Sequence, residues 1–416
     1  DNWMEMNETI TAIDIGTTKI CTIVARKVNG EFPEVIAHSV VPCSGLKKGN
    51  VENINLTSQA IGASLKEIRE KTDSLVSSAY IGITGSHIDF ENRIDLLDDI
   101  GSHGVITSEE VDKIPQLISS GLESYGRNVI HTVPATYRID GYNGINNPVG
   151  MHANGVEVAS HVVTAGASFV KNLEASVTSA GISVKAMVLE PLASSEAILS
   201  AKQKEKGAAI VDIGGGTTDI VAFKKGSIGY TSVIPVGGFQ FTNDICLTYN
   251  TTFSDAENIK LRYGNTEPSS VDMRELIDAQ VVDSNVRSSI NRRDMCQLIR
   301  ERSMELIRLI DLKLQESGIR ENLDADVVIT GGASGLPGFF QMAQKYMPNC
   351  NIKIGLPFHL SGMSKELESP AYSTGVGILL YASRQERSLQ RNKHINTRGA
   401  INDGGGGLMS KIKSLF

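Results

Sequence analysis

Two stretches of the chain share one pattern of apolar and polar positions. "TAIDIGTTKICTIVA" (11–25) and "AAIVDIGGGTTDIVAF" (208–223) each contain two apolar runs rich in β-branched residues, separated by Asp-x-Gly and further Gly or Thr residues. This pattern predicts a strand, a tight turn and a returning strand. Because the pattern occurs twice, the sequence predicts a duplicated α/β domain in which each hairpin opens one lobe.

A third Gly-rich segment differs from these two. "VVITGGASGLPGFF" (327–340) predicts a buried strand that runs into Gly331 and Gly332, followed by a helix beyond Pro337. Phosphates and sugars commonly bind at such a place, beyond the carboxyl end of a strand and at the start of a helix. The segment is therefore a candidate ligand-binding loop.

Helical spacing of apolar residues predicts helices over 55–71 and 292–318, and the second ends on a glycine. The periodicity stops past Tyr381. The segment that follows is polar, mostly basic and poor in apolar residues. It is predicted to be a flexible linker, 385–407.

Length and composition limit the class of protein. With 416 residues, 41% hydrophobic and 21% charged, the chain has the composition of a soluble globular protein with two or more lobes. A formal net charge of −7 and a single Trp argue against a nucleic-acid-binding body. The five cysteines are scattered without a C-x-x-C motif, which excludes a disulfide scaffold or zinc ribbon and favours a reducing cytoplasm. No secretory leader or membrane-spanning apolar stretch is evident, so we expect neither export nor a transmembrane segment.

The turns of the two hairpins have the chemistry of a phosphate site. Glycines let several backbone N–H groups converge on an anion, and the threonines add hydroxyl donors. A carboxylate beside a polyphosphate repels it unless a divalent cation lies between them, so Asp14 and Asp212 are predicted to bind Mg²⁺ through water. Lys19 can neutralise phosphate charge directly. Two matching turns and a third Gly-rich loop together predict a nucleotide site, although neither a Walker loop nor a G-x-G-x-x-G fingerprint is present.

These motifs resemble those of the superfamily that contains actin, the sugar kinases and the heat-shock chaperones, whose members clamp ATP between two duplicated lobes. The resemblance implies an α/β, actin-like, two-lobe ATPase fold with the nucleotide in the interdomain cleft. The residues that it implies for ATP binding are Asp14, Gly16, Thr17, Thr18 and Lys19 in the first phosphate loop, Asp212, Gly214, Gly215, Gly216 and Thr217 in the second, and Gly331, Gly332, Ala333 and Ser334 in the adenosine loop.

Three further residues follow from the same resemblance. "SDAENIKLRYG" (254–264) places Glu257 and Lys260 on one helical face, like the residues that border adenine and ribose; an exposed salt bridge is the alternative. "LEPLASSEAIL" (189–199) is similar to the first interdomain connector of the superfamily. In its chaperone-like and MreB-like members the Glu of Glu-Pro orients the attacking water, which makes Glu190 the catalytic candidate. A favourable charge at a helix start is the alternative role.

Other segments narrow the resemblance to one branch. "RRDMCQLIRER", "NNPVGMHANGVEVASHVVTAG" and the C-terminal tail together closely resemble the FtsA family of actin-like bacterial division proteins, from about residue 9 to 382 and again in the tail. The resemblance implies self-association into head-to-tail filaments, binding of the C-terminal peptide of FtsZ, and recruitment of later divisome proteins. Arg302, and more weakly Arg293, matches the basic surface that binds this acidic peptide. A solvated helix face is the alternative.

The same resemblance divides the chain into subdomains. It implies subdomain IA at 7–86, 164–193 and 367–384, an inserted subdomain IC at 87–163, subdomain IIA at 194–247 and 322–366, and subdomain IIB at 248–321.

The last residues, "GGGGLMSKIKSLF" (404–416), form an amphipathic pattern. On a helical wheel the apolar residues share one arc and the lysines lie outside it, as in a helix that lies in the plane of a membrane surface. The residues that it assigns to membrane binding are Leu408, Met409, Lys411, Ile412, Lys413, Leu415 and Phe416. One such helix binds weakly, so a filament carrying many copies is needed for firm attachment. We therefore expect a peripheral protein on the cytoplasmic face of the cell membrane, at the division site.

Two other functions remain open at this point: a PilM-like role in pilus assembly, and a small-molecule kinase of the same superfamily. Sugar phosphorylation would identify the kinase, and PilM-like proteins ordinarily lack the amphipathic tail. The sequence leaves the rate of ATP hydrolysis open, and the opening "DNWMEMN" resembles no family motif.

Overall fold

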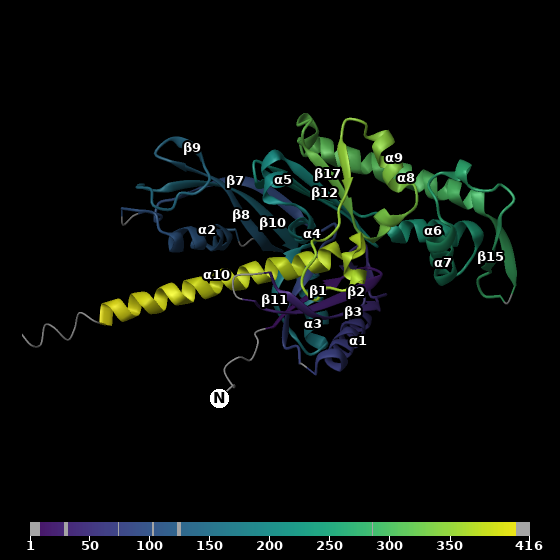
Figure 1. Cartoon of the computed structure of the whole chain (residues 1–416), viewed down its shortest axis with the longest axis horizontal. Coiled ribbons are helices and arrows are strands. Elements are labelled where there is room, and N and C mark those ends of the chain that lie inside the picture. The colour runs from purple at the N-terminus through teal and green to yellow at the C-terminus, as the bar shows by residue number, and fades with distance from the viewer. Residues whose placement is uncertain are drawn as a thin grey trace, which may run out of the picture.

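The computed structural model describes residues 9–28, 32–73, 75–101, 104–122, 126–284 and 286–404, with side chains as far as residue 388. It has two lobes joined near their middle, and a long helix leaves the body between them (Figure 1). Each lobe is built on a five-stranded sheet. In lobe I the strand order is β11 (Ser183–Leu189), β6 (Ser78–Ile83), β1 (Thr9–Ile15), β2 (Lys19–Arg26) and β3 (Glu34–Pro42). In lobe II it is β14 (Ser227–Ile234), β13 (Thr218–Lys224), β12 (Ala208–Ile213), β17 (Asp326–Thr330) and β18 (Asn351–Ile354).

The two sheets have the same topology, which confirms the predicted duplication. In each sheet the first three strands form an antiparallel meander, and the next two continue in parallel from the first strand. The hairpin registers correspond: Asp14 lies opposite Cys21 in lobe I, and Asp212 lies opposite Asp219 in lobe II. Strands β1 and β12 are buried along nearly their whole length, because helices and the other lobe cover both faces of the sheets.

Helices cover the outer faces of both sheets. The predicted helix over 55–71 is confirmed as α1 (Ile54–Thr72), which begins at Asn53, whose side chain accepts a hydrogen bond from the amide of Leu56. The predicted helix over 292–318 is confirmed as α8 (Arg292–Glu316), and Gly318 follows it with a φ of 71°. The remaining helices of the two lobes are α3 (Ala167–Ser179), α4 (Glu190–Ile198), α5 (Ala201–Lys206), α6 (Gly238–Tyr249), α7 (Phe253–Tyr263) and α9 (Phe339–Tyr346).

Short elements complete the lobes. They are the hairpins β4 (Leu46–Lys47)–β5 (Asn50–Val51) and β15 (Leu276–Gln280)–β16 (Arg287–Asn291), and the 3₁₀ turns η1 (Pro268–Ser270), η2 (Ile319–Glu321), η3 (Gly332–Gly335), η4 (Lys365–Glu368) and η5 (Pro370–Tyr372).

An insertion between β6 and α3 forms a sheet of its own. Its strand order is β7 (Asp89–Leu97), β10 (Val156–Gly166), β8 (Arg127–Ile139) and β9 (Tyr142–Ile145), with α2 (Ser108–Ser120) packed beside it. Ile114 and Ile118 of α2 pack with Val156 and Val158 of β10 in a separate small core. We call this part of the chain, residues 85–164, the inserted subdomain.

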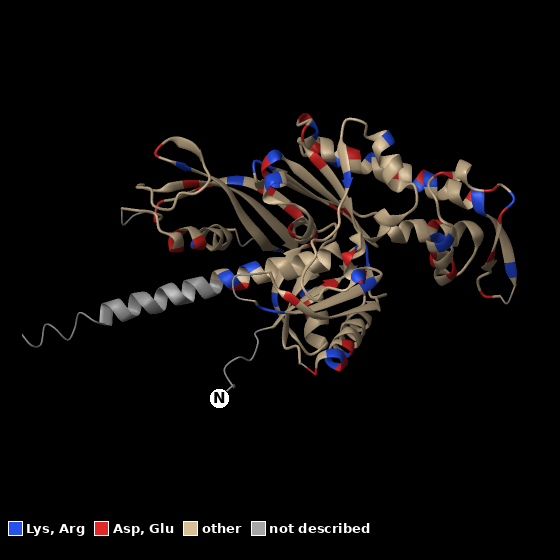
Figure 2. Ribbon diagram, in the orientation of Figure 1, with Lys and Arg blue, Asp and Glu red and all other residues tan. Residues whose placement is uncertain are grey.

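The final helix differs from the sequence-based expectation. Helix α10 spans Ser373–Gly404, so it continues into the segment 385–407, for which the sequence predicts a flexible linker. Tertiary contacts explain the difference. Glu386 of α10 accepts hydrogen bonds from the Tyr80 hydroxyl at 2.9 Å, from Lys27 Nζ at 3.2 Å and from Lys185 Nζ, while Arg384 contacts Glu196 at 2.8 Å. These contacts hold the part of α10 around residues 384–386, where Figure 2 marks basic positions on the helix.

The membrane-binding segment predicted at 408–416 lies outside the described residues. Among the residues that the structure does describe, no helix is long and apolar enough to cross a membrane.

Glu386→Gln is expected to loosen the start of this docked segment. Burial alone would raise the pKa of Glu386, but the hydrogen bonds from Lys185, Tyr80 and Lys27 lower it from its ordinary value of 4.5 to about 2. The ionised carboxylate therefore contributes stability at neutral pH, and this contribution is lost as the pH falls from 4.5 towards 2. We expect about 10-fold faster hydrogen exchange of the α10 amides near residue 386, equivalent to a loss of about 1.4 kcal/mol.

Glu70→Gln is the matched control, because Glu70 is an exposed helical carboxylate 3.9 Å from Lys66. Equal exchange in the two variants would show that the ion pairs do not hold α10. The difference between wild type and Glu386→Gln must also shrink below pH 4.5.

Candidate functional site

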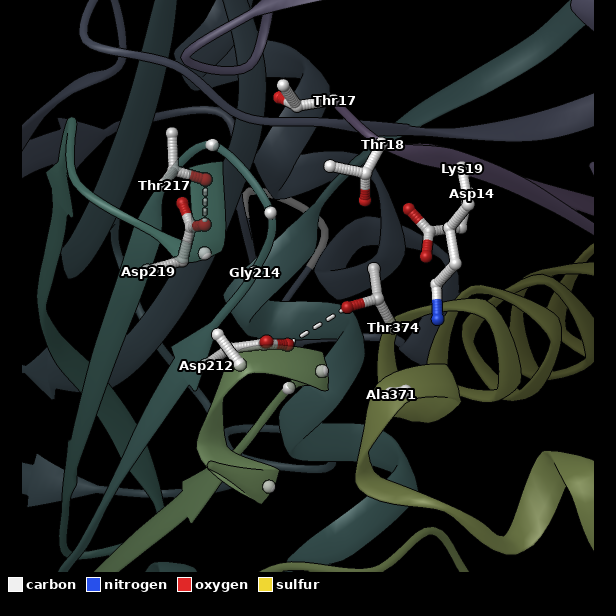
Figure 3. Close-up of a pocket in the computed structure, with 18 of the residues that line it drawn as sticks. Asp14, Thr17, Thr18, Lys19, Asp212, Gly214, Thr217, Asp219, Ala371 and Thr374 are labelled. Carbon is white, nitrogen blue, oxygen red and sulfur yellow. Dashed lines mark hydrogen bonds between the residues drawn. The ribbon is translucent and has the colours of Figure 1, made fainter. Parts of the chain in front are cut away.

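The predicted loops meet in one pocket between the lobes. This interlobe pocket has a volume of about 550 Å³. The turn between β1 and β2 forms its lobe I side, and the turn between β12 and β13 faces it from lobe II. The loop after β17, helices α6 and α7, and the start of α10 close the remaining sides. The side chains of the two hairpins point towards one another across this space (Figure 3).

The structure brings nearly all the predicted ligand-binding residues to this pocket. The residues that line it are Asp14, Gly16, Thr17, Thr18, Lys19, Glu190, Asp212, Gly214, Gly215, Gly216, Thr217, Glu257, Lys260, Gly331, Gly332 and Ala333. Ser334 does not line it. Its hydroxyl donates to the carbonyl of Gly331 at 2.6 Å and so stabilises the turn of the loop.

The two hairpin turns approach each other without room for larger residues. A Cβ atom on Gly216 would lie 2.2 Å from Thr17 Oγ1, and one on Gly215 would lie 2.8 Å from Thr18 Oγ1. Thr17 Oγ1 also accepts a hydrogen bond from the amide of Gly49, in the short turn between β4 and β5. Glycine is therefore required in the lobe II turn by the close approach of the lobe I threonines.

Asp14 and Asp212 lie at equivalent positions in the two hairpins, and both are buried. Burial raises the pKa of Asp14 to about 7; Lys19 opposes this shift and Asp212 adds to it. Burial also raises the pKa of Asp212, although hydrogen bonds from the hydroxyls of Ser194 and Thr374 oppose it. Two buried carboxyl groups that share the single positive charge of Lys19 form a site suited to a further cation.

Glu190 and Asp219 add two more buried carboxyl groups to the pocket. Burial, followed by repulsion from Asp14, Asp219 and Asp212, raises the pKa of Glu190 well above its ordinary value. Burial also raises the pKa of Asp219 to about 7, against the hydrogen bonds that it accepts from Thr84 and Thr217. Within the described part of the chain, no three such side chains are arranged to ligate a metal directly. The donor set therefore fits a hydrated divalent cation held through water.

Lys19 is the cation of the lobe I turn. Its ammonium group lies 3.9 Å from the centre of the Tyr372 ring, whose hydroxyl donates to Glu366 at 3.0 Å. Burial lowers the pKa of Lys19, and Asp14 opposes the shift. The aromatic ring holds the ammonium group at the edge of the pocket, in reach of an anionic ligand.

Glu257 and Lys260 form an ion pair, but not the exposed one considered as an alternative. Lys260 Nζ donates to Glu257 Oε2 at 2.8 Å, to Thr242 Oγ1 at 2.9 Å and to the carbonyl of Gly238 at 3.2 Å. The Lys260 side chain is only 11% exposed. The pair thus ties α7 to α6 at the pocket wall.

Sequence reasoning missed four polar residues of the pocket: Thr84, Asp219, Tyr372 and Thr374. Asp219 lies within the second hairpin segment, 208–223. It corresponds in register to Cys21 of the first hairpin, so comparison of the two hairpins did not single it out. Thr374 donates to Asp212 at 2.9 Å from the first turn of α10 (Figure 3). Its position depends on a helix that reaches the pocket from the far end of the chain.

Arg302 and Arg293 lie away from the pocket, on α8. Arg302 donates from Nε and Nη2 to the carboxylate of Asp244, at 2.6 and 2.9 Å, and from Nη1 to Glu305 at 2.5 Å. Arg293 donates from Nε and Nη2 to the carbonyl of Val271, at 3.1 and 2.8 Å. Both guanidinium groups therefore have partners within the chain.

Comparisons with known proteins agree with this architecture. The family model described as "Cell division protein FtsA" matches residues 209–377, and the model described as "SHS2 domain inserted in FTSA" matches residues 85–164. A relative from Pseudomonas aeruginosa, described as "Cell division protein FtsA", is 33% identical over 392 residues, which cover 92% of this chain and 91% of the relative.

Two solved structures share the fold at low sequence identity. The "PilM-PilN type IV pilus biogenesis complex" matches with a TM-score of 0.62 and 16% identity, over 90% of this chain and 98% of the other. MreB 5 of Spiroplasma citri, bound to AMPPNP, matches with a TM-score of 0.52 and 13% identity, over 94% and 99% of the two chains. The two-lobe architecture is therefore actin-like.

Proposed function

Because the chain belongs to the FtsA family of cell division proteins, we propose that it is an ATP-dependent filament protein that ties FtsZ to the cytoplasmic membrane. In this proposal ATP and Mg²⁺ bind in the interlobe pocket, copies of the chain polymerise, and the C-terminal segment 408–416 attaches the polymer to lipid. Recruitment of later divisome proteins would follow at the division site. Membership of this family argues against the PilM-like and kinase alternatives.

The observation that carries the nucleotide part is the convergence of three loops on one pocket. Thr17, Thr18 and Lys19 face Gly214 to Thr217 across a space of about 550 Å³, and the Gly331–Ala333 loop borders the same space. Backbone amides and hydroxyls at the two turns suit phosphates, and Lys260 beside Glu257 suits the polar edge of a nucleoside. Mg²⁺, held through water by Asp14 and Asp212, would supply the charge that joins these carboxylates to a polyphosphate.

Glu190 is the residue that we propose to orient the attacking water. It is the first residue of α4 and it lines the pocket, where burial raises the pKa of its carboxyl group well above its ordinary value, as burial also raises those of Asp14 and Asp219. In its ionised form the Glu190 carboxylate is suited to accept a hydrogen bond from a water and so to orient it, and a nearby Mg²⁺ would favour that form.

The FtsZ part of the proposal concerns α8. Arg302 would bind a carboxylate of the FtsZ C-terminal peptide, and Arg293 would add a weaker contact. Because Asp244 and Glu305 already accept hydrogen bonds from Arg302, the peptide must compete with two carboxylates of this chain. The affinity of this contact is therefore expected to be modest.

The direct test is equilibrium binding of a fluorescent ATP analogue with and without Mg²⁺. Lys260→Ala is expected to weaken binding about 10-fold or more, since a charge-assisted contact contributes roughly 1.5–3 kcal/mol. Lys345→Ala is the matched control, because Lys345 lies in the same lobe outside the interlobe pocket. No Mg²⁺-dependent binding by the wild-type protein, or equal affinities in the two variants, would contradict the assignment of the pocket.

A further inference from the structure

The inserted subdomain contacts both lobes through two buried histidines on neighbouring strands. His131 lies on β8 and is 7% exposed, and His161 lies on β10 and is 1% exposed. In the register of the two strands His131 pairs with Val163, while His161 pairs with Val133. The inserted sheet lies beside the junction of the lobes (Figure 1), and each of these two side chains contacts a different lobe.

His131 binds lobe I at the strand end that leads into the pocket. Its Nε2 atom accepts a hydrogen bond from the amide of Leu189 at 2.9 Å. Because an amide can only donate, Nε2 is unprotonated and the ring proton lies on Nδ1, 3.5 Å from the Tyr381 hydroxyl. The Tyr381 ring also meets the imidazole edge to face, with centroids 5.5 Å apart. The ring is therefore fixed in one orientation and one tautomer.

Leu189 is the residue directly before Glu190. It is the last residue of the edge strand β11 and the N-cap of α4, and no side chain caps the helix at this point. The Leu189 amide has its partner on the inserted subdomain, outside lobe I. Behind Glu190, a Cβ atom on Gly82 would lie 3.3 Å from the Glu190 carboxylate. A displacement of the junction would therefore displace the carboxylate as well.

His161 makes the corresponding contact with lobe II. Its Nδ1 and Nε2 atoms lie 2.7 Å from Asn92 Oδ1 and 3.3 Å from Thr231 Oγ1 of β14. Asn92 Nδ2 donates to the carbonyl of Gly229 at 2.9 Å. Phe90 stacks on His161, with centroids 4.9 Å apart, and meets Tyr230 edge to face at 5.3 Å. One small sheet thus holds lobe II through His161 and the Leu189–Glu190 junction of lobe I through His131.

We propose that His131 is a positioning residue that holds the Leu189–Glu190 junction from the inserted subdomain, so that the inserted subdomain controls where the Glu190 carboxylate lies in the interlobe pocket. This inference rests on the proposed function in one respect, the action of Glu190 on bound ATP. A partner that pulls on the inserted subdomain would, by this route, change turnover without touching the pocket.

Three substitutions of His131 test its role as a hydrogen-bond acceptor separately from the volume of its ring. His131→Gln places an amide oxygen near the position of Nε2, His131→Asn carries the same group on a shorter side chain, and His131→Leu fills the space without an acceptor. His161→Leu is the matched control, because it removes a buried histidine from the neighbouring strand and leaves the acceptor of Leu189 in place.

The first readout is hydrogen exchange of the Leu189 amide in the full chain. We expect exchange to rise at least 10-fold in His131→Leu and His131→Asn, to stay near the wild-type rate in His131→Gln, and to be unchanged in His161→Leu. Wild-type exchange at Leu189 in His131→Leu, or equal exchange in the two leucine variants, would overturn the proposal.

The second readout is ATP turnover against ATP affinity. His131→Leu is expected to lower turnover about 10-fold with less than 3-fold change in affinity, since a misplaced water-orienting group affects the reaction more than binding. Combined with Glu190→Gln it should cause no further loss. Additive losses would overturn the link to Glu190. If Glu190→Gln alone leaves turnover unchanged, the catalytic part of the proposed function fails, while exchange at Leu189 still decides the role of His131.

Discussion

Gly216→Ala is expected to weaken ATP binding about 100-fold. The added Cβ atom would lie 2.2 Å from Thr17 Oγ1, 2.9 Å from Thr17 Cβ and 3.1 Å from the Cα atom of Lys48. Contacts this short force the lobe I and lobe II turns apart, and overpacking of this kind costs about 1–3 kcal/mol. Because both turns are proposed to bind the same phosphates, this separation of the turns is expected to lower the affinity for the nucleotide.

The control for this variant is Gly229→Ala on β14. No atom lies within 4 Å of the Cβ position there, so the same chemical change meets open space. Equilibrium titration with a fluorescent ATP analogue measures both variants, and thermal unfolding without nucleotide checks that each is folded. Equal affinities would mean that the two turns do not bind one ligand together.

Removal of residues 405–416 is expected to abolish membrane attachment. Five partly buried apolar side chains contribute about 1 kcal/mol each, and two lysines near anionic lipid add about 1 kcal/mol each. Ordering nine residues at about 1 kcal/mol each opposes most of this gain. A single tail therefore binds weakly, and many tails on one filament bind together with high avidity.

Co-sedimentation with anionic liposomes in the presence of ATP and Mg²⁺ tests this expectation. The truncated chain should pellet at least 10-fold less than the full chain, and Ile412→Asp should resemble the truncation because it places a charge on the apolar face. Neutral liposomes should reduce the attachment of the full chain. Equal pelleting of the full and truncated chains would contradict the membrane role of this segment.

The sequence predicted those parts of the site that depend on local structure. The hairpins at 11–25 and 208–223 follow from β-branched runs around glycine turns, and the loop at 327–340 from a buried strand that runs into two glycines. Each pattern is complete within a few residues. Chain duplication then explains why the two turns face one another, and Asp14 and Asp212 both line the pocket between them.

Features that depend on contacts between distant segments were not predictable in this way. The contacts that Lys27, Tyr80 and Lys185 make with Glu386 of α10 join segments far apart in the sequence. Thr374 reaches Asp212 only because the start of α10 packs between the lobes. A polar, basic segment has no apolar periodicity that would reveal such docking, so composition alone favoured a linker.

The duplicated hairpins also give the pocket a direction. Two identical turns related by duplication would accept an elongated ligand equally well either way round. At two pairs of equivalent positions, however, lobe I has Lys19 and Cys21 where lobe II has Thr217 and Asp219. The lobe I turn therefore offers a cation and the lobe II turn an additional carboxyl group. A ligand with a charged end and a neutral end is stabilised in one orientation only, so two exchanges in a repeated hairpin suffice to turn a symmetrical cleft into a polar one.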